Sequence, residues 1–196
     1  MSDAAIDLLG SRGAREVSHG KVDRHANVPA GTTSFYFRTR RALLLGVAER
    51  MTELDVADLS RMTELAGDPT AGYTGTRGLA ALVMASSAEP YLTRTRARYE
   101  LTMQASREPE LAALLERFTV KVTDLVRQVI RDWHGDAEPA AGTVDERAAM
   151  LLALINGVMM SFTHGTPVVA DVEQLDAWIQ TILTGTAPGS GPRGGG

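Results

Sequence analysis

Residues 22–43, VDRHANVPAGTTSFYFRTRRAL, decide how this chain folds. The segment opens on the end of a short helix and continues with Asn27, which tolerates the left-handed backbone of a tight turn. Pro29 then stands where a second helix would begin, because its fixed φ suits a first helical position. The segment therefore predicts a helix, a turn of a few residues and a second short helix over Ala30–Phe37.

The early part of this second helix carries only small or hydroxylated side chains. A helix that enters the major groove of DNA must bring its leading face close to the base edges, so bulk there is unfavourable. Thr32 and Thr33 can hydrogen-bond to bases or phosphates, and Tyr36 offers a hydroxyl to a phosphate. Three basic residues that can attract phosphate follow: Arg38, Arg40 and Arg41. An ordinary surface helix followed by solvated arginines is the alternative.

The charge is distributed unevenly along the chain, with the basic excess at the N-terminal end. The whole chain carries a formal charge of −4. Residues 1–50 hold eight basic and five acidic side chains, a balance of +3, which leaves −7 for the remainder. A basic head on an acidic body is consistent with a DNA reader joined to a separate sensing domain.

The run Gly13–Leu43 resembles the DNA-binding domain of the tetracycline-repressor (TetR) family. In that family a tight turn precedes a short recognition helix of the form Gly-Thr-x-x-x-x-Tyr/Phe-Phe, then a Ser/Thr cap, a basic residue and an apolar pair. Here Asn27 stands at the turn glycine, and Ser34 stands where an aromatic residue is frequent. The matching positions are Ala26-Asn27-Val28, Gly31-Thr32, Tyr36-Phe37, Thr39, Arg40 and Ala42-Leu43.

The resemblance implies a role for each matching residue. Thr32, Tyr36 and Arg40 would hold the DNA backbone, while Phe37 and Leu43 would be core. The residues expected in or beside the major groove are Lys21, Ala30, Thr33 and Phe35. The complete set of expected DNA-binding residues is Lys21, Ala30, Gly31, Thr32, Thr33, Phe35, Tyr36, Thr39 and Arg40.

Beyond this segment the chain is all-α, with about nine helices. Apolar residues recur at three- and four-residue steps, and aromatic content is only 5%. A short helix around Ala5–Leu9, ended by Gly10 and Gly13, precedes one near Ser18–Ala26. The expected later helices are Arg40–Leu65, Gly78–Ala88, Pro90–Ser106, Glu110–Trp133, Val144–His164 and Asp171–Leu183.

Three regions follow from this pattern. Residues 1–50 are expected to form an N-terminal three-helix, helix-turn-helix DNA-binding domain. Residues 51–185 are expected to form a C-terminal helical ligand-binding and dimerisation domain, as the resemblance implies. Residues 186–196, rich in Gly and Pro, are expected to be a disordered tail.

A small-molecule pocket is implied between the helices of the second region. Methionine and aromatic side chains adapt to irregular ligands, although plain core is the alternative for each of them. The candidate lining residues are Met84, Tyr91, Tyr99, Met103, Phe118 and Met159. Arg94, Arg98 and Glu100 are expected to be solvated, and one that pointed inward would imply a polar or anionic group on the ligand.

The last two helices are expected to pair with their copies in a second subunit. A homodimer would read two half-sites of a palindromic operator, about one helical turn apart. The residues 150–160 are apolar nearly all round the helix, as expected of a helix buried on several sides. The candidate interface residues are Leu151, Leu154, Ile155, Val158, Trp178 and Ile182.

Other classes of protein are disfavoured. The four histidines have no metal-ligand spacing, so we expect no metal, and no cofactor motif is present. No nucleophile has a base at a suitable spacing, so we do not expect an enzyme. The chain lacks cysteine, a signal-peptide pattern and an apolar run long enough to cross a bilayer, so a cytoplasmic location without membrane contact is expected.

The sequence therefore predicts a transcriptional regulator, usually a repressor in such families, that a small-molecule effector releases from double-stranded DNA. The alternative is a helical small-molecule-binding protein without DNA function.

Overall fold

A computed structural model describes residues 1–66, 75–135 and 142–185, with the backbone alone at 59–66. These residues form nine α-helices and a 3-10 turn, with no strand among them, so the all-α prediction is confirmed. The elements are α1 (Ser2–Arg12), η1 (Ala14–Glu16), α2 (His19–His25), α3 (Thr32–Tyr36), α4 (Arg40–Ala66), α5 (Gly75–Ala85), α6 (Tyr91–Ala105), α7 (Pro109–His134), α8 (Thr143–Thr163) and α9 (Val172–Thr184).

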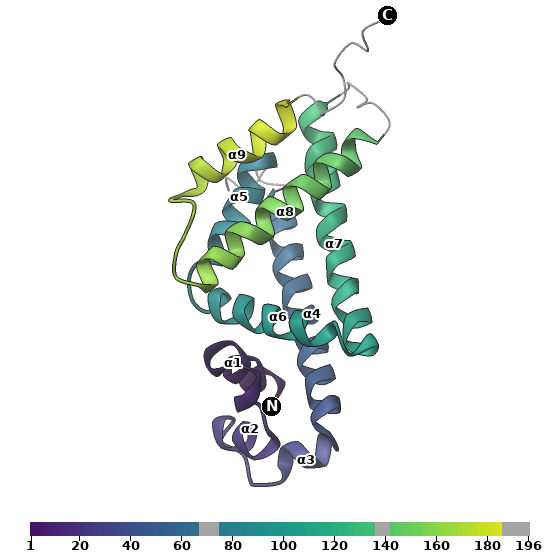
Figure 1. The fold of residues 1–196 in the computed structure, drawn as a ribbon, viewed down its shortest axis with the longest axis vertical. Coiled ribbons are helices and arrows are strands. Elements are labelled where there is room, and N and C mark those ends of the chain that lie inside the picture. Colours follow the sequence, from purple (N-terminus) through teal and green to yellow (C-terminus); the bar gives the residue numbers. More distant parts are fainter. Residues whose placement is uncertain (67–74, 136–141, 186–196) are drawn as a thin grey trace, which may run out of the picture.

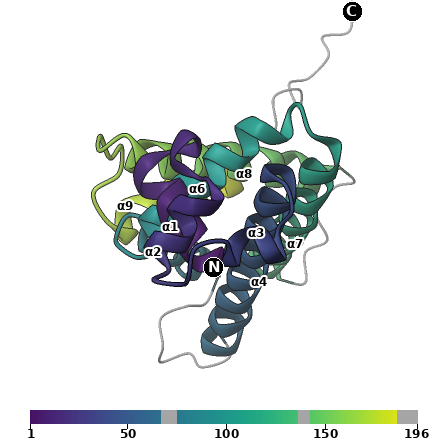
Figure 2. The same cartoon turned by 90° about the horizontal axis from the view of Figure 1, so that it is seen from below.

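The helices α1, α2 and α3 lie together at one end of the molecule, and α9 lies at the other (Figure 1). The long helix α4 starts beside α3 and runs into the body, where it packs against α7. Helix α6 crosses between the two ends and packs against α1. Figure 2 looks at the molecule from the α3 end, so that α1, α2 and α3 face the reader. The short helix α3 is thus placed at the tip of the protein.

Two hydrophobic clusters hold the described residues together. One joins α5, the second half of α7, α8 and α9, around Ile130, Leu151 and Leu175. The other joins α1, α2 and the start of α4, and it continues into Ala97 and Leu101 of α6 and Leu111 of α7. The division between residues 1–50 and 51–185 stays a prediction, because side chains from both sides of it share this second cluster.

Two N-terminal details differ from the sequence-based expectation. Gly10 lies inside α1 and does not end it; Gly13, with φ 81°, caps that helix. A Cβ on Gly10 would lie 2.0 Å from the carbonyl oxygen of Thr93, so the backbones of α1 and α6 touch there. Helix α3 begins at Thr32 and not at Ala30, because Gly31 has a left-handed backbone with φ 92°. Residues 67–74, between the predicted helices Arg40–Leu65 and Gly78–Ala88, and the predicted tail at 186–196 lie outside the described residues.

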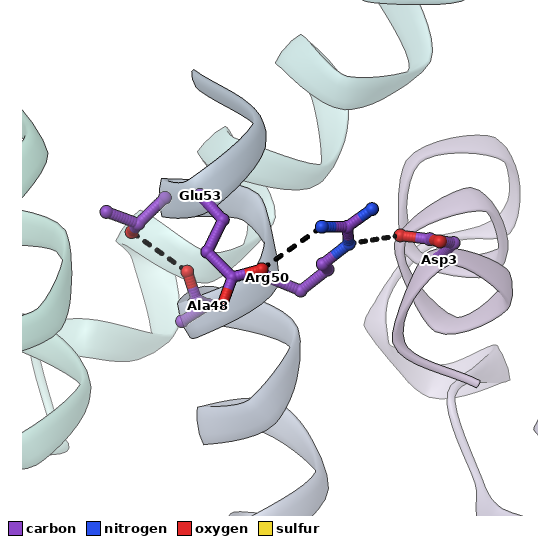
Figure 3. Close-up of polar contacts among 5 residues, drawn as sticks. Asp3, Ala48, Arg50 and Glu53 are labelled. Carbon is purple, nitrogen blue, oxygen red and sulfur yellow. Dashed lines mark hydrogen bonds and ion pairs between the residues drawn. The ribbon is translucent and has the colours of Figure 1, made fainter. Parts of the chain in front are cut away.

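Polar contacts also connect α1 to α4. Arg50 of α4 donates from Nε to Oδ1 of Asp3 at 2.8 Å, and from Nη1 to Oε2 of Glu53 at 3.1 Å (Figure 3). These hydrogen bonds raise the pKa of Arg50, and the bond that it donates to Asp3 raises it most. All three side chains are well exposed, so each pair contributes less than about 1 kcal/mol. The apolar cluster, and not this pair, stabilises the packing of α1.

Within the described ranges, none of the helices combines the length and the hydropathy that crossing a lipid bilayer requires.

Candidate functional site

The turn between α2 and α3 uses two residues with positive φ. Asn27 has φ 53°, as expected of an asparagine in a tight turn, and Gly31 follows with φ 92°. The N–H of Val28 donates to the carbonyl of Asp23 at 3.0 Å, which ties the turn to the end of α2. The chain therefore reverses within a few residues and starts α3 directly beside α2.

A carboxylate on α2 caps α3. Asp23, only 3% exposed, accepts from the N–H of Gly31 at 2.8 Å and from the N–H of Thr33 at 2.7 Å. It also accepts from the Thr33 hydroxyl at 2.5 Å. The hydroxyl bond is the largest cause of a lowered pKa at Asp23, followed by the bonds from the two N–H groups. Asp23 fixes the orientation of α3, and the sequence analysis did not predict this role.

The prediction that Thr33 lies in or beside the major groove is wrong. Its side chain is fully buried, and its hydroxyl is bonded to Asp23. The second residue of α3 points toward α2 because the capping carboxylate sits there. Thr33 positions the helix and presents nothing to a ligand outside.

The outward face of α3 is exposed and aromatic. Phe35 and Tyr36 are 71% and 64% exposed, with their rings in an edge-to-face contact at 5.2 Å between centroids. Ala30, Gly31 and Ser34 are also exposed. Thr32 is half-buried, and its hydroxyl donates to the carbonyl of Pro29 at 2.6 Å. Large exposed aromatic side chains beside small ones are typical of a binding surface.

Three of the basic side chains near α3 have partners within the protein. Lys21 pairs with Glu16 at 2.7 Å, and Arg41 pairs with Glu110 at 3.0 Å. The guanidinium of Arg40 donates to the carbonyls of Val17 and Ala14. Arg40 thus joins the start of α4 to the turn before α2, and its contact with phosphate remains a prediction.

The first turn of α4 is built as the sequence predicted. The Thr39 hydroxyl accepts from the N–H of Ala42 at 3.1 Å, so Thr39 caps the helix. Leu43 is fully buried, and Phe37 packs against the same cluster. A Cβ on Gly46 would lie 2.3 Å from Cε1 of Phe37, so this glycine makes room for the ring. These contacts anchor the end of α3 to the long helix.

A small, partly open cavity of about 50 Å3 lies between α4, α6 and α7. Its polar lining includes Asp55 of α4 and Arg98 of α6, which form a bidentate ion pair. One turn away along α6, Arg94 pairs with Asp58. The lining residues are Met51, Thr52, Asp55, Arg98, Thr102, Leu115, Phe118 and Thr119.

The expectation that Arg94, Arg98 and Glu100 are solvated is wrong. Arg94 and Arg98 are 14% and 22% exposed, and each lies over an aromatic ring, that of Tyr91 or Phe118. Glu100 accepts from the N–H of Ala14 at 3.4 Å. Arg94 and Arg98 turn inward because two carboxylates of α4 meet them there, and Glu100 meets a backbone N–H just after α1.

The six predicted ligand residues do not surround one cavity. Phe118 lines the cavity described above, and the ring of Tyr91 lies under the guanidinium of Arg94 next to that cavity. The Tyr99 hydroxyl donates to the carbonyl of Asn156 at 3.0 Å, and burial raises the pKa of Tyr99. Met84 and Met159 pack against the cluster around α8. Met103 is 74% exposed, so its assignment to a pocket is wrong.

A second hollow, of about 250 Å3, lies between α1 and α2 and is open to solvent. It is larger but polar: Lys21 pairs with Glu16, and His25 pairs with Asp7 at 2.5 Å, while Arg12 and Arg24 of its lining form no ion pair with the described side chains. The cavity between α4, α6 and α7 is the less open of the two and the better candidate for a small molecule, because ligand sites bury most of the ligand surface.

The predicted dimer residues divide between the core and the surface. Leu151, Ile155 and Val158 are buried in the chain's own core, so their assignment to an interface with a second subunit is wrong. Leu154 and Ile182 are half-buried and pack against that core, and Trp178 is 38% exposed.

The outer face of α8 carries small and apolar residues that sequence analysis did not assign. Met150 is 45% exposed, and Ala149, Ala153 and Gly157 are exposed along the same helix. Their spacing of three and four residues places them opposite the buried stripe of α8. This spacing is visible in the sequence. In a helix that is apolar nearly all round, however, the sequence does not show which face packs into the chain's own core.

Comparison with known proteins places these features in a family. Residues 74–188 match the family described as tetracyclin repressor-like, C-terminal domain. No curated protein matches the sequence.

Solved structures share the fold over nearly the whole chain. A transcriptional regulator from Rhodococcus sp. Rha1 is 18% identical, with 93% of this chain and 91% of that one covered and a TM-score of 0.71. A protein from Saccharomonospora viridis in complex with choline is 16% identical, with 93% and 92% covered and a TM-score of 0.74. The multidrug binding protein EbrR, complexed with ethidium, is 24% identical, with 92% and 94% covered and a TM-score of 0.64.

Proposed function

This chain belongs to the tetracyclin repressor-like family, and from that premise we infer that it is a DNA-binding transcriptional regulator that responds to a small molecule. The observation that carries the DNA-binding part is the exposed aromatic face of α3, at the tip of the molecule. A helix presented in this way fits the major groove, which is wide enough to admit it. We infer no catalytic role, and a regulator of the chromosome would act in the cytoplasm.

The DNA contacts are assigned by position around α3. Phe35, Ala30 and Gly31 face the bases, where the structure leaves them exposed. Tyr36 and Thr39 lie at the far end of α3 and the start of α4, within reach of a phosphate backbone. Lys21, Thr32 and Arg40 keep their proposed contacts with sugar and phosphate, and the buried Thr33 is left out of the set.

The regulator acts as a homodimer through α8 and α9. An exposed face made of Met150, Ala153 and Gly157 allows close approach of two helices, and Trp178 adds a large apolar surface on α9. Two copies related by a two-fold axis present two α3 helices to successive major grooves, about 34 Å apart. The operator is therefore proposed to be palindromic.

The small-molecule part of the proposal rests on the cavity between α4, α6 and α7. Two of the structurally similar proteins hold small ligands, choline in one and ethidium in the other. In this chain the cavity touches α4, the helix that leads directly from α3 into the body. A ligand that moved α4 would change the distance between the two α3 helices of the dimer. We assign the ligand the role of releasing a repressor from DNA.

Fluorescence anisotropy with labelled duplexes tests the DNA-binding part. The duplexes are tiled across the region upstream of the protein's own gene, with random duplexes as reference, at two salt concentrations. One tile is expected to bind at least about a hundredfold better than random DNA, with affinity that falls steeply as salt rises. The Phe35→Ala variant is expected to lose this preference, whereas Trp133→Ala, which removes another exposed aromatic residue far from α3, keeps it.

A helical small-molecule-binding protein without DNA function is the second candidate. It is favoured by the same cavity, because a carrier needs the cavity and does not need α3. If no tile binds better than random DNA at either salt concentration, the regulator assignment fails and the carrier is the better description.

A further inference from the structure

The ion pair in the cavity between α4, α6 and α7 has two members that are buried to different extents. The side chain of Asp55 is 7% exposed and that of Arg98 is 22% exposed. Arg98 donates to both carboxylate oxygens, from Nη2 at 2.6 Å and from Nε at 3.2 Å. Among the side chains that the structure describes, Arg98 makes all the hydrogen bonds to Asp55. Asp55 requires a cation at this position, because a buried carboxylate without a partner is strongly unfavourable.

Arg98 is the member of the pair that can leave. Its side chain is long and partly exposed, so the guanidinium can turn to water while its methylene groups stay on the protein surface. Asp55 has a single methylene group and is held on a long helix. A ligand that displaces Arg98 must therefore supply a positive charge to Asp55, whereas an anion that captured Arg98 would leave Asp55 buried and unpaired.

The threonines of the cavity present only acceptor oxygens to it. The hydroxyl of Thr52 donates to the carbonyl of Ala48 at 2.9 Å. Thr102 donates in the same way to the carbonyl of Arg98 at 2.9 Å, and Thr119 donates to that of Leu115 at 3.3 Å. A hydroxyl has one hydrogen and two lone pairs, so each of these oxygens is left as an acceptor. Once Arg98 has left, the polar lining suits a donor that carries positive charge.

An aromatic ring completes the lining. The guanidinium carbon of Arg98 lies 5.0 Å from the centroid of the Phe118 ring. The negative face of such a ring attracts a cation within about 6 Å. Arg98 thus occupies the place of a ligand's cationic centre, between a carboxylate and a ring face.

We propose that the effector is a small organic cation, such as an alkylated guanidinium, amidinium or ammonium, that exchanges with the Arg98 guanidinium between Asp55 and Phe118. The inference rests on the proposed function, because only a regulator has an effector. The cavity of about 50 Å3, enlarged by the departed guanidinium, holds a cation with short substituents. Exchange breaks a direct link between α6 and α4, and this is how binding reaches the helix that carries α3.

Calorimetric titration of the full chain with three small probes at constant ionic strength tests the charge of the ligand. The probes are methylguanidinium chloride, its uncharged near-isostere methylurea, and sodium acetate. Saturable binding is expected for methylguanidinium alone, with methylurea at least about tenfold weaker, a difference of about 1.4 kcal/mol. Equal binding of methylurea, saturable binding of acetate, or no binding of methylguanidinium overturns the proposal.

Two substitutions test the place of binding. Asp55→Asn is expected to weaken methylguanidinium binding at least about tenfold, and Arg98→Met, which removes the internal competitor, is expected to strengthen it by a similar factor. Arg127→Met is the matched control, because it removes an arginine paired with Asp124 and Asp145 on the surface, and it should change nothing. Unchanged binding in Asp55→Asn overturns the proposal. If either cavity variant fails to fold, the three-probe comparison on the unmodified chain decides.

The two proposals can fail separately. Selective binding of one DNA duplex together with no preference for the cation leaves the regulator standing and overturns the cation site. Saturable, Asp55-dependent cation binding by a protein that binds no duplex selectively supports the cation site and removes its role as an effector site.

Discussion

Oδ1 of Asp23 accepts both hydrogen bonds that Thr33 donates, one from the backbone N–H at 2.7 Å and one from the hydroxyl at 2.5 Å. The two residues belong to neighbouring helices, α2 and α3, and both are buried. The pair therefore sets the angle at which α3 leaves the turn, and with it the direction in which Phe35 and Tyr36 point.

Replacing this carboxylate should impair DNA binding from a position that touches no DNA. Asp23→Asn keeps the size of the side chain but weakens its bonds to the two N–H groups, so α3 loses its fixed orientation. Affinity for the preferred duplex is expected to fall at least about tenfold in anisotropy titrations. Glu49→Gln, which changes an exposed carboxylate on α4, is the control and should bind normally. Normal binding by Asp23→Asn would show that the cap is dispensable.

The same carboxylate predicts a pH dependence of stability. The Thr33 hydroxyl lowers the pKa of Asp23 in the folded chain below its unfolded value of about 3.9. Its contribution to stability is therefore complete above pH ~4 and is lost as the pH falls through the folded pKa. Urea unfolding should separate the unmodified chain from Asp23→Asn at pH 7, and the two curves should converge toward pH 2. A constant difference across that range contradicts the prediction.

The two exposed aromatics of α3 should contribute to DNA binding in different ways. Tyr36→Phe removes one hydroxyl proposed to bind phosphate, so binding to preferred and random duplexes should weaken by a similar factor of about two to ten. Phe35→Ala should weaken the preferred duplex alone, because Phe35 is proposed to face the bases. Salt-dependent anisotropy with both duplexes measures the two ratios. Selective loss in Tyr36→Phe would reverse the assignment.

Two helical glycines should respond to alanine in opposite directions. A Cβ at Gly10 would lie 2.0 Å from the Thr93 carbonyl, so Gly10→Ala must separate α1 from α6, at a cost of about 1–3 kcal/mol in unfolding free energy. At Gly20 the nearest atom is the flexible end of Arg24 at 3.7 Å, so Gly20→Ala should stabilise α2 by about 0.5–1 kcal/mol. Urea denaturation compares them; the same sign for both contradicts this reading of α1.

The outer face of α8 can be tested through the mass of the assembly. Ala153→Arg places a long charged side chain on the proposed interface, which should convert the dimer to a monomer or abolish tight association. Phe35→Arg is the control, because Phe35 is an exposed apolar residue on α3, at the far end of the molecule from α9 (Figure 1). Light scattering after size-exclusion chromatography gives both masses. A dimer that survives in Ala153→Arg would locate the interface elsewhere.

The long helices could be read from the sequence because their signals are local. The apolar residues of α7 recur at helical spacing, and Pro109 stands at its first turn. The turn at Asn27 was predictable for the same reason, since one residue type determines the backbone there. These features depend on neighbours in the chain, and the structure agrees with them.

The contacts that set the site depend on residues far apart in the sequence, so they could not be predicted. Gly10 looked like the end of a helix, because nothing near it in the chain shows that Thr93 passes over it. Thr33 looked like a surface threonine until Asp23, ten residues earlier, was found to bind it. Asp55 interrupts the apolar stripe of α4 four residues after Met51, and that polar residue on a core face was the one available hint of the cavity.

The shared cluster at the base of the molecule limits how the protein could be re-engineered. Leu9, Val22 and Leu43 share their core with Ala97, Leu101 and Leu111, which lie in the region proposed to sense the effector. A chimera that joined residues 1–50 to an unrelated C-terminal region would remove the partners of Leu9, Val22 and Leu43 and expose these side chains to water. To change the DNA sequence that the protein prefers, only the exposed residues of α3 should therefore be substituted. The rest of residues 1–50 should be kept together with the C-terminal region against which it packs.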